Sequence, residues 1–175
     1  MIKPQLVNSA KNLPSRGEWL YELKFDGFRI LAFIEQGNVR LVTRGQNDFT
    51  TAFPRAVDML KNLPNCVLDG EIVCDKFPPT HQGIFIAFDI LFFGEKDLRE
   101  LPLIERKAIL ETIDVNQSDY LENITKVQFQ KICAQNHEGI IAKLRDSTYQ
   151  GSRSGAWLKL KCPNYMRINS TKPQL

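Results

Sequence analysis

The 175-residue sequence predicts an α+β domain. Seven short segments rich in β-branched and aromatic residues predict strands, and tight polar turns between several of them favour largely antiparallel pairing. Three stretches with helical spacing of apolar residues lie among these segments. This mixture is typical of a domain in which helices cover a pair of sheets. With 43% hydrophobic residues, the chain can bury one sizeable core.

Each expected element follows from its local pattern. The expected strands cover residues 18–25, 28–35, 38–43, 67–74, 84–93, 138–144 and 156–162. Helices are expected over 53–60, where Phe53, Ala56, Val57 and Leu60 precede Pro64, over 103–113 after Pro102, and over 127–135. The segment 84–93 is nearly all apolar, so we expect its strand to be buried on both faces.

The segment Tyr21–Arg29, YELKFDGFR, holds the first candidate catalytic residue. In an extended segment Lys24 and Glu22 share one face, which would pin the lysine beside a carboxylate. A free lysine has a pKa of about 10.4, so a nucleophilic amine needs burial or nearby cations. Gly27 permits close approach of a ligand, and Arg29 offers a planar fork to phosphate. The alternative is an ordinary hairpin with Asp26-Gly27 as its turn.

Paired acids occur in Val67–Cys74, VLDGEIVC. Asp69 and Glu71 lie two residues apart, so both carboxylates can face one side of a strand. Acids there are tolerable if they bind a cation, a sugar hydroxyl or an arginine. LDGE is also a hairpin candidate.

Two further segments each contain one residue that stands out. Asp89 is the one charge in IFIAFDILFF, and a satisfied core aspartate would explain it. Arg44 lies in LVTRGQNDFT, which also fits a polar loop leaving a strand.

The last two segments bring acids and amines together. In EGIIAK, Glu138 stands at the entrance of a short strand and Lys143 at its exit. In SRSGAWLKLK, Lys159 and Lys161 share one strand face, while the intervening leucines face the other way. Two amines directed at one place predict an anion there, although a solvated strand face is the alternative.

These six segments, in this order, resemble the KxDGxR, TRxG, DGE, FDxL, EGxxxK and KxK motifs of the covalent nucleotidyltransferases. Within that superfamily the chain is most similar to bacterial ATP-dependent DNA ligases of the end-joining type. The resemblance implies an ATP-grasp-like adenylation domain over residues 1–162, with two largely antiparallel sheets and flanking helices enclosing a nucleotide cleft. It leaves a short tail, 163–175, which is too short for the family's OB domain, so we expect that domain to be absent.

The resemblance also implies roles for particular residues. The family's motif lysine, matched by Lys24, attacks the α-phosphate of ATP and expels pyrophosphate. Lys159 and Lys161 match the pair that neutralises the phosphate, and we count them as catalytic with Lys24. Matches to residues that bind the nucleotide are Glu22, Arg29, Arg44, Glu71, Phe88 (against adenine) and Lys143. Glu71 and Glu138 match residues that serve Mg²⁺ or Mn²⁺. One departure is that the glycine of TRxG is displaced to position 45, leaving Gln46 in its place.

The implied partner is nicked duplex DNA, sealed during repair or recombination. A separately encoded OB domain or end-joining proteins are possible further partners. We expect a cytoplasmic, nucleoid-associated monomer with no membrane segment. The net charge of +3 permits a polyanionic partner without requiring one. The four cysteines show no CxxC pair, which predicts reduced thiols rather than a zinc site or disulfides.

Two alternatives stay open. The first keeps the fold and changes the substrate, giving an RNA ligase or a capping-type nucleotidyltransferase. The second is a truncated, non-catalytic module that binds nucleotide or DNA ends.

Overall fold

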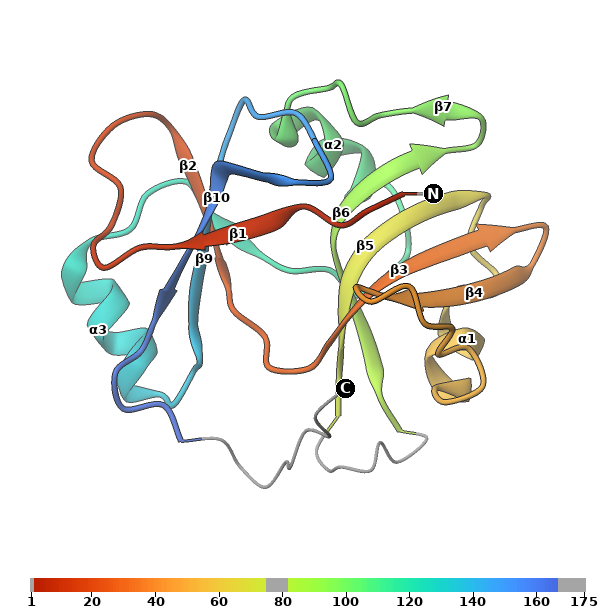
Figure 1. The fold of residues 1–175 in the computed structure, drawn as a ribbon, viewed down its shortest axis with the longest axis horizontal. Helices are drawn as coiled ribbons and strands as arrows, with labels where there is room; N and C mark the ends of the chain where they lie inside the picture. The colour runs from red at the N-terminus through yellow and green to blue at the C-terminus, as the bar shows by residue number, and fades with distance from the viewer. Residues whose placement is uncertain (1, 75–81, 167–175) are drawn as a thin grey trace.

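The computed structural model describes residues 2–74 and 82–166 and folds them into two five-stranded sheets (Figure 1). Sheet 1 has the order β1-β10-β9-β2-β8, and sheet 2 has the order β4-β3-β5-β6-β7. Sheet 1 consists of β1 (Leu6–Ser9), β2 (Trp19–Leu23), β8 (Tyr120–Leu121), β9 (Gly139–Leu144) and β10 (Arg153–Lys161). Sheet 2 consists of β3 (Phe28–Glu35), β4 (Asn38–Thr43), β5 (Cys66–Val73), β6 (Ile84–Phe93) and β7 (Lys96–Asp97).

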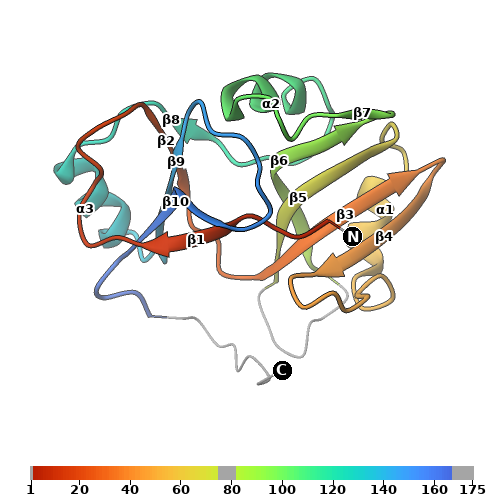
Figure 2. The ribbon, with the colours of Figure 1, turned by 45° about the horizontal axis from the view of Figure 1, so that its top comes forward.

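Helices cover the outer face of each sheet (Figures 1 and 2). α3 (Lys126–Ala134) packs Phe129 and Ile132 against alternate residues of sheet 1, including Ile140 and Leu160. α1 (Pro54–Leu60) and α2 (Leu103–Leu110) pack against the larger core of sheet 2. Because strand residues alternate in direction, the other residues of each sheet face the opposite sheet.

The inner faces meet through a small aromatic cluster. Leu31, Phe88 and Leu91 from sheet 2 pack against Trp157 of β10 and against Tyr149. This cluster joins the two sheets at one end. It therefore fixes the distance between the inner faces beside the charged residues of β2, β5 and β9 that lie next to it.

The helix ends follow local sequence signals. α1 has Pro54 in its first turn, where a missing N–H costs nothing. α3 begins with a capping box formed by Thr125 and Gln128. α2 ends three residues earlier than predicted, because the Ile113 N–H donates to the Leu110 carbonyl oxygen in a tighter turn.

The sequence predicts the seven longer strands to within a few residues. Three strands were missed: β1, β7 and β8. β7 and β8 contain two residues each, too few for a period to be visible. β1 is half-polar and pairs in parallel with β10, whereas the other strand pairs are antiparallel among the described residues. The prediction of largely antiparallel sheets is therefore confirmed.

Both hairpin alternatives are wrong. β2 and β3 belong to different sheets, so Asp26-Gly27 lies in the crossing between sheets and not in a hairpin turn. Gly27 has to be a glycine there, since a Cβ would lie 2.1 Å from the Ile72 carbonyl oxygen. Gly70 lies inside β5, where a Cβ would lie 2.4 Å from the Phe85 ring.

The prediction of four reduced cysteines is corrected for two of them. Cys133 at the end of α3 and Cys162 after β10 form a disulfide, with Cα atoms 5.2 Å apart. Sequence spacing could not reveal the pair, because the two residues are brought together only when α3 packs on sheet 1. Cys66 is a free thiol, and burial raises its pKa to about 12, which keeps it protonated.

The disulfide yields a stability prediction. The bond closes a loop with a sequence separation of 29, so Cys133→Ser is expected to lower the free energy of unfolding by about 2–4 kcal/mol. Urea denaturation with and without reductant measures this difference. Reductant should destabilise the wild type by a similar amount and leave the variant unchanged. Equal stability of the oxidised wild type and the variant would contradict the prediction.

None of the helices formed by residues 2–74 and 82–166 has the length and apolar character needed to cross a membrane.

Candidate active site between the sheets

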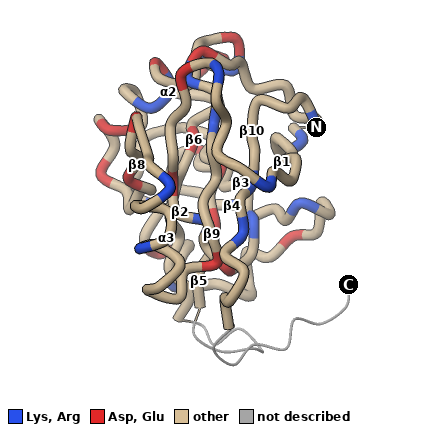
Figure 3. The backbone as a smooth tube through the Cα atoms, turned by 90° about the vertical axis from the view of Figure 1, so that its left-hand side faces the viewer, with Lys and Arg blue, Asp and Glu red and all other residues tan. Residues whose placement is uncertain are grey.

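A cavity of about 120 Å³ lies between the inner faces of the two sheets. It is lined by Glu22, Lys24, Lys143 and Trp157 from one side and Arg29, Glu71 and Phe88 from the other. The structure thus brings together seven residues from six strands and their connections. Acidic and basic residues lie close together along β2 and β9 in this region (Figure 3).

Lys24 leaves the end of β2 and enters this cavity. Its backbone N–H donates to the Gly139 carbonyl oxygen at 2.9 Å, which anchors the residue to β9. Its Nζ donates to Glu138 Oε2 at 2.5 Å, and its side chain is only 21% exposed. The amine is therefore held in one place instead of moving freely in water.

Glu138 connects Lys24 to the basic end of β10. Its second oxygen, Oε1, lies 3.3 Å from Lys161 Nζ. Lys159 lies on the same face of β10 as Lys161, half-buried, while Leu158 and Leu160 pack toward α3. The predicted alternation along β10 is confirmed, although Lys159 does not line the cavity itself.

Arg29 is held by an aspartate. Its Nε and Nη2 donate to the two oxygens of Asp69 at 2.5 and 2.6 Å, and the Tyr149 hydroxyl donates to Asp69 at 2.6 Å. Burial alone would lower the pKa of Arg29, but the Asp69 carboxylate outweighs burial and raises it. The Arg29 guanidinium, which we expected to contact phosphate, therefore binds the Asp69 carboxylate in this structure.

Asp69 is fully buried and was not among the predicted site residues. The sequence placed it beside Glu71 on one strand face, but the Arg29 partner depends on the register of β3 against β5. Burial, followed by the nearby Asp69 carboxylate, raises the pKa of the Tyr149 hydroxyl well above its ordinary value. The hydroxyl therefore stays protonated and keeps donating to the carboxylate.

A β-bulge presents Phe88 to the cavity. Asp69 pairs with Asp89 and Gly70 with Ala87, so Phe88 is the extra residue on β6. A bulge turns a side chain away from its regular direction. The Phe88 ring meets Trp157 edge-on at 6.1 Å between centroids. The predicted buried strand with a satisfied Asp89 is also confirmed, since Asp89 pairs with Arg106 of α2.

Cations flank the Phe88 ring. The guanidinium of Arg29 lies 4.5 Å from the ring centroid, and Nζ of Lys143 lies 4.4 Å from it. Lys143 also lies 4.2 Å from the centroid of a Trp157 ring. Aromatic faces attract cations, so these contacts hold both charges at the cavity wall.

Glu22 and Lys143 form a fully buried ion pair with Nζ and Oε2 2.8 Å apart. The other oxygen of Glu22 lies 2.7 Å from Nζ of Lys107, a residue of α2 that sequence reasoning missed. Burial lowers the pKa of Lys143 to about 8, and the nearby Glu22 carboxylate limits that decrease.

The two predicted metal-binding carboxylates belong to different sheets: Glu71 lies in β5 and lines the cavity, and Glu138 lies just before β9. Glu71 Oε1 accepts the Gly27 N–H at 3.0 Å. The described residues contain no group of three or more His, Cys, Asp or Glu side chains that could hold a metal. Mg²⁺ commonly takes one or two carboxylates and completes its shell with water and substrate phosphates. The two carboxylates fit a site of that kind.

Arg44 does not line the cavity and is exposed in the loop that follows β4. Within this loop Gln46 adopts the left-handed region, with φ of 66°. The Gln46 N–H donates to the Thr43 carbonyl oxygen, which closes the turn. The left-handed conformation therefore persists where the related motif has glycine.

This loop carries a stability prediction. A left-handed residue other than glycine costs about 1–2 kcal/mol, partly offset by the larger unfolded-state entropy of glycine. Gln46→Gly is therefore expected to raise the free energy of unfolding by about 0.5–1 kcal/mol. Asn47→Gly is the matched control, because Asn47 is not left-handed, and it should be neutral or destabilising. Equal effects of the two substitutions in thermal unfolding would contradict this account.

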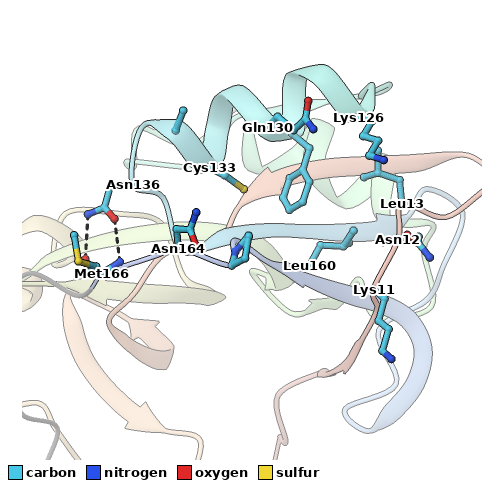
Figure 4. Close-up of a pocket in the computed structure, with 13 residues that line it drawn as sticks. Lys11, Asn12, Leu13, Lys126, Gln130, Cys133, Asn136, Leu160, Asn164 and Met166 are labelled. Carbon is cyan, nitrogen blue, oxygen red and sulfur yellow. Dashed lines mark hydrogen bonds between the residues drawn. The ribbon is translucent and has the colours of Figure 1, made fainter.

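A larger hollow, about 870 Å³, lies elsewhere, between α3, residues 11–13 and the segment after β10 (Figure 4). Its walls include Leu13, Phe129, Cys133 and Leu160. It lies on the opposite face of sheet 1 from Lys24 and contains no predicted site residue. This hollow is the larger of the two, but clustered charged and aromatic side chains are typical of a functional site. We therefore assign the candidate active site to the smaller cavity.

The chain matches the sequence model of one known family. The model is described as an ATP dependent DNA ligase domain, and it matches residues 4–82 and 76–161.

Individual relatives agree with that match. The multifunctional non-homologous end joining protein LigD of Pseudomonas aeruginosa is 32% identical over 200 residues, covering 99% of this chain and 24% of that protein. DNA ligase C2 of Mycolicibacterium smegmatis is 32% identical, covering 85% of this chain and 51% of that protein.

Solved structures are similar as well. The ligase domain of Mycobacterium tuberculosis LigD superposes with a TM-score of 0.78 at 29% identity, covering 91% of this chain and 59% of that chain. A mycobacterial DNA ligase D complexed with ATP and MES gives a TM-score of 0.77 at 29% identity, with 91% and 60% coverage. The chain thus spans about a quarter of the P. aeruginosa relative and about three fifths of these two structures.

Proposed function

Because the chain belongs to the ATP-dependent DNA ligase family, we propose that it is an adenylation domain that uses Lys24 to form lysyl-AMP. The Nζ lone pair forms a bond to the α-phosphorus of ATP, and the bond from that phosphorus to the bridging oxygen breaks and releases pyrophosphate. The AMP then passes to the 5′-phosphate at a nick in duplex DNA, and attack by the 3′-hydroxyl releases AMP.

One observation carries this proposal: the Lys24 amine lies inside a cavity whose walls hold cations, carboxylates and an aromatic pair. A nucleophile that reacts with ATP needs cations to stabilise the phosphate charge that develops in the transition state. Lys161 stands next to the same glutamate as Lys24, and Lys159 shares its strand face. These two lysines are proposed to neutralise the α-phosphate.

The wall formed by Phe88 and Trp157 is proposed to bind the base. These two rings give the cavity an aromatic surface, and Lys143 and Glu22 line the cavity beside it. Arg29 is proposed to hold the Phe88 ring in place and to add positive charge near the phosphates. Arg44 is exposed and is proposed to contact DNA phosphate. Such a contact positions DNA without reading its sequence.

Glu71 and Glu138 would hold Mg²⁺ or Mn²⁺, which when bound supplies positive charge to the phosphates. Glu138 accepts a hydrogen bond from Lys24 Nζ, so it is also proposed to orient the amine.

The cavity of about 120 Å³ is smaller than the roughly 300–1,000 Å³ typical of ligand pockets. ATP binding is therefore expected to separate the sheets or to move the Lys24 and Arg29 side chains. A separately encoded OB domain or end-joining proteins are proposed partners here. The working form is proposed to be a cytoplasmic, nucleoid-associated monomer.

Mass spectrometry of the purified protein after incubation with ATP and Mg²⁺ tests the proposal. We expect one added adenylate on Lys24, and we expect a chelator to prevent it. Sealing assays on nicked DNA and nicked RNA, each with ATP and GTP, then assign the substrate. Absence of the adenylate even after an OB domain is supplied would contradict the proposed activity.

A further inference from the structure

We infer that Lys107 of α2 is a positioning residue for the nucleotide site, because it holds the Glu22 carboxylate from behind and leaves Lys143 directed at the cavity. This inference rests on the proposed function. It concerns a residue outside the six motif segments, and it gives that residue a role in binding ATP.

The geometry of the Glu22 carboxylate carries the first step. Each of its oxygens faces a different lysine: Oε1 lies 2.7 Å from Lys107 Nζ and Oε2 lies 2.8 Å from Lys143 Nζ. All three side chains are about 2% exposed. Lys143 Nζ donates a hydrogen bond to Oε2, whereas Lys107 Nζ lies beside Oε1 as an ion pair without hydrogen-bond geometry. Each oxygen thus lies against a cation in a space closed to water, and this holds the carboxylate between the two lysines.

Only part of this cluster reaches the cavity. Glu22 and Lys143 line it, whereas Lys107 does not. Lys107 stands on the far side of Glu22, 5.6 Å from the centroid of the Tyr120 ring. Lys107 therefore acts on the cavity through Glu22, and it cannot contact a bound nucleotide directly.

The charge balance argues against a purely structural ion pair. Two buried lysines share one carboxylate, so the cluster carries one excess positive charge when all three groups are ionised. The neighbouring buried pair, Arg106 with Asp89, is balanced one to one. An uncompensated charge away from water is costly. The member of the cluster that faces the cavity is Lys143, where a ligand with an electron-rich acceptor offsets the excess charge.

The surroundings of Lys143 determine its response to Lys107. Lys143 faces Glu22 from β2, Lys107 from α2 and Asp89 from β6, with the Phe88 and Trp157 rings on either side. Burial, opposed by the Glu22 carboxylate and assisted by the positive charge of Lys107, lowers the pKa of Lys143 to about 8. Removing the Lys107 charge removes a like charge and leaves Glu22 to Lys143 alone, and both changes raise the pKa of Lys143.

The test compares Lys107→Met and Lys107→Arg with the wild type in the whole chain. For each protein the rate of lysine adenylation is measured as a function of ATP concentration, at several pH values below and above 8. We expect Lys107→Met to weaken ATP binding about tenfold, because the Glu22 carboxylate loses one of the two cations that hold it in place. We also expect the alkaline inflection of the adenylation rate to move to higher pH, because Lys143 loses a neighbouring like charge. Lys107→Arg, which keeps the charge, should restore both properties in large part.

Arg106→Lys is the matched control, because it alters a buried ion pair of the same helix that does not touch Glu22. We expect a loss of thermal stability with no movement of the pH inflection. NMR titration of the lysine ε-methylene groups, assigned through Lys143→Arg, provides a readout that needs no activity. It should show the Lys143 midpoint rising in Lys107→Met.

The outcomes separate the inference from the proposed function. Adenylation of the wild type with an unmoved Lys143 midpoint and unchanged ATP dependence in Lys107→Met would overturn the positioning role alone. Failure of the wild type to bind ATP or form an adenylate would overturn the proposed function. If Lys107→Met does not fold, the test uses Lys107→Arg, which keeps the positive charge. A titration midpoint of Lys143 far from the wild-type value in this variant overturns the inference. A midpoint equal to the wild-type value supports it.

Discussion

Lys24→Ala is expected to abolish transfer of label from α-labelled ATP to the protein, a loss of at least about 1,000-fold. The side chain removed is the proposed nucleophile. The substitution also releases Glu138 from its 2.5 Å contact, but Lys161 remains 3.3 Å from the same carboxylate. The fold is therefore expected to persist while the chemistry stops.

Lys24→Arg separates the charge of Lys24 from its nucleophilicity. Arginine keeps a positive charge for Glu138, but its guanidinium does not lose a proton in proteins and provides no free amine. The variant should fold and bind ATP without becoming labelled. Lys96→Ala is the control for the label itself, because Lys96 is exposed on β7 and belongs to neither wall of the cavity. Label retained in Lys24→Arg would exclude Lys24 as the attacking group.

Local patterns predicted most elements of this fold because each long strand and helix carries its own period. The strand over 84–93 was apparent from an uninterrupted apolar run, and it matches β6 (Ile84–Phe93). Alternation along β10 placed the lysines on one face and the leucines on the other. The two-residue strands were missed, since a period cannot be observed in two residues.

The partners of the charged residues could not be predicted from the sequence. Arg29 meets Asp69 because of the register between β3 and β5. Glu22 of sheet 1 meets Lys107 because α2, which packs on sheet 2, places this lysine beside β2. Both contacts join segments separated by 40 or more residues. The disulfide between Cys133 and Cys162 arises in the same way, from the packing of α3. Candidate reactive residues were thus visible as motif positions, while the groups that orient them were not.

Asp69→Asn tests the most buried of these partnerships. The substitution keeps the shape of the side chain and removes the negative charge that faces Arg29. Breaking a buried ion pair from one side costs about 3–5 kcal/mol, because the other charge stays buried without compensation. Arg29 is 22% exposed and Asp69 is not exposed at all, so water relieves only part of this penalty. We expect the free energy of unfolding in urea to fall by about 3 kcal/mol, near the low end of that range.

Asp97→Asn is the control with the same chemistry at the surface. Asp97 binds Arg99 through both carboxylate oxygens, as Asp69 binds Arg29, but its side chain is 42% exposed and that of Arg99 is 37% exposed. Exposed pairs contribute at most about 1 kcal/mol, so this variant should be nearly as stable as the wild type. Similar losses in the two variants would show that burial does not set the strength of the Arg29 pair. A large loss confined to Asp69→Asn, together with weaker ATP binding, would indicate that this pair holds Arg29 against Phe88 and so shapes the proposed base-binding wall.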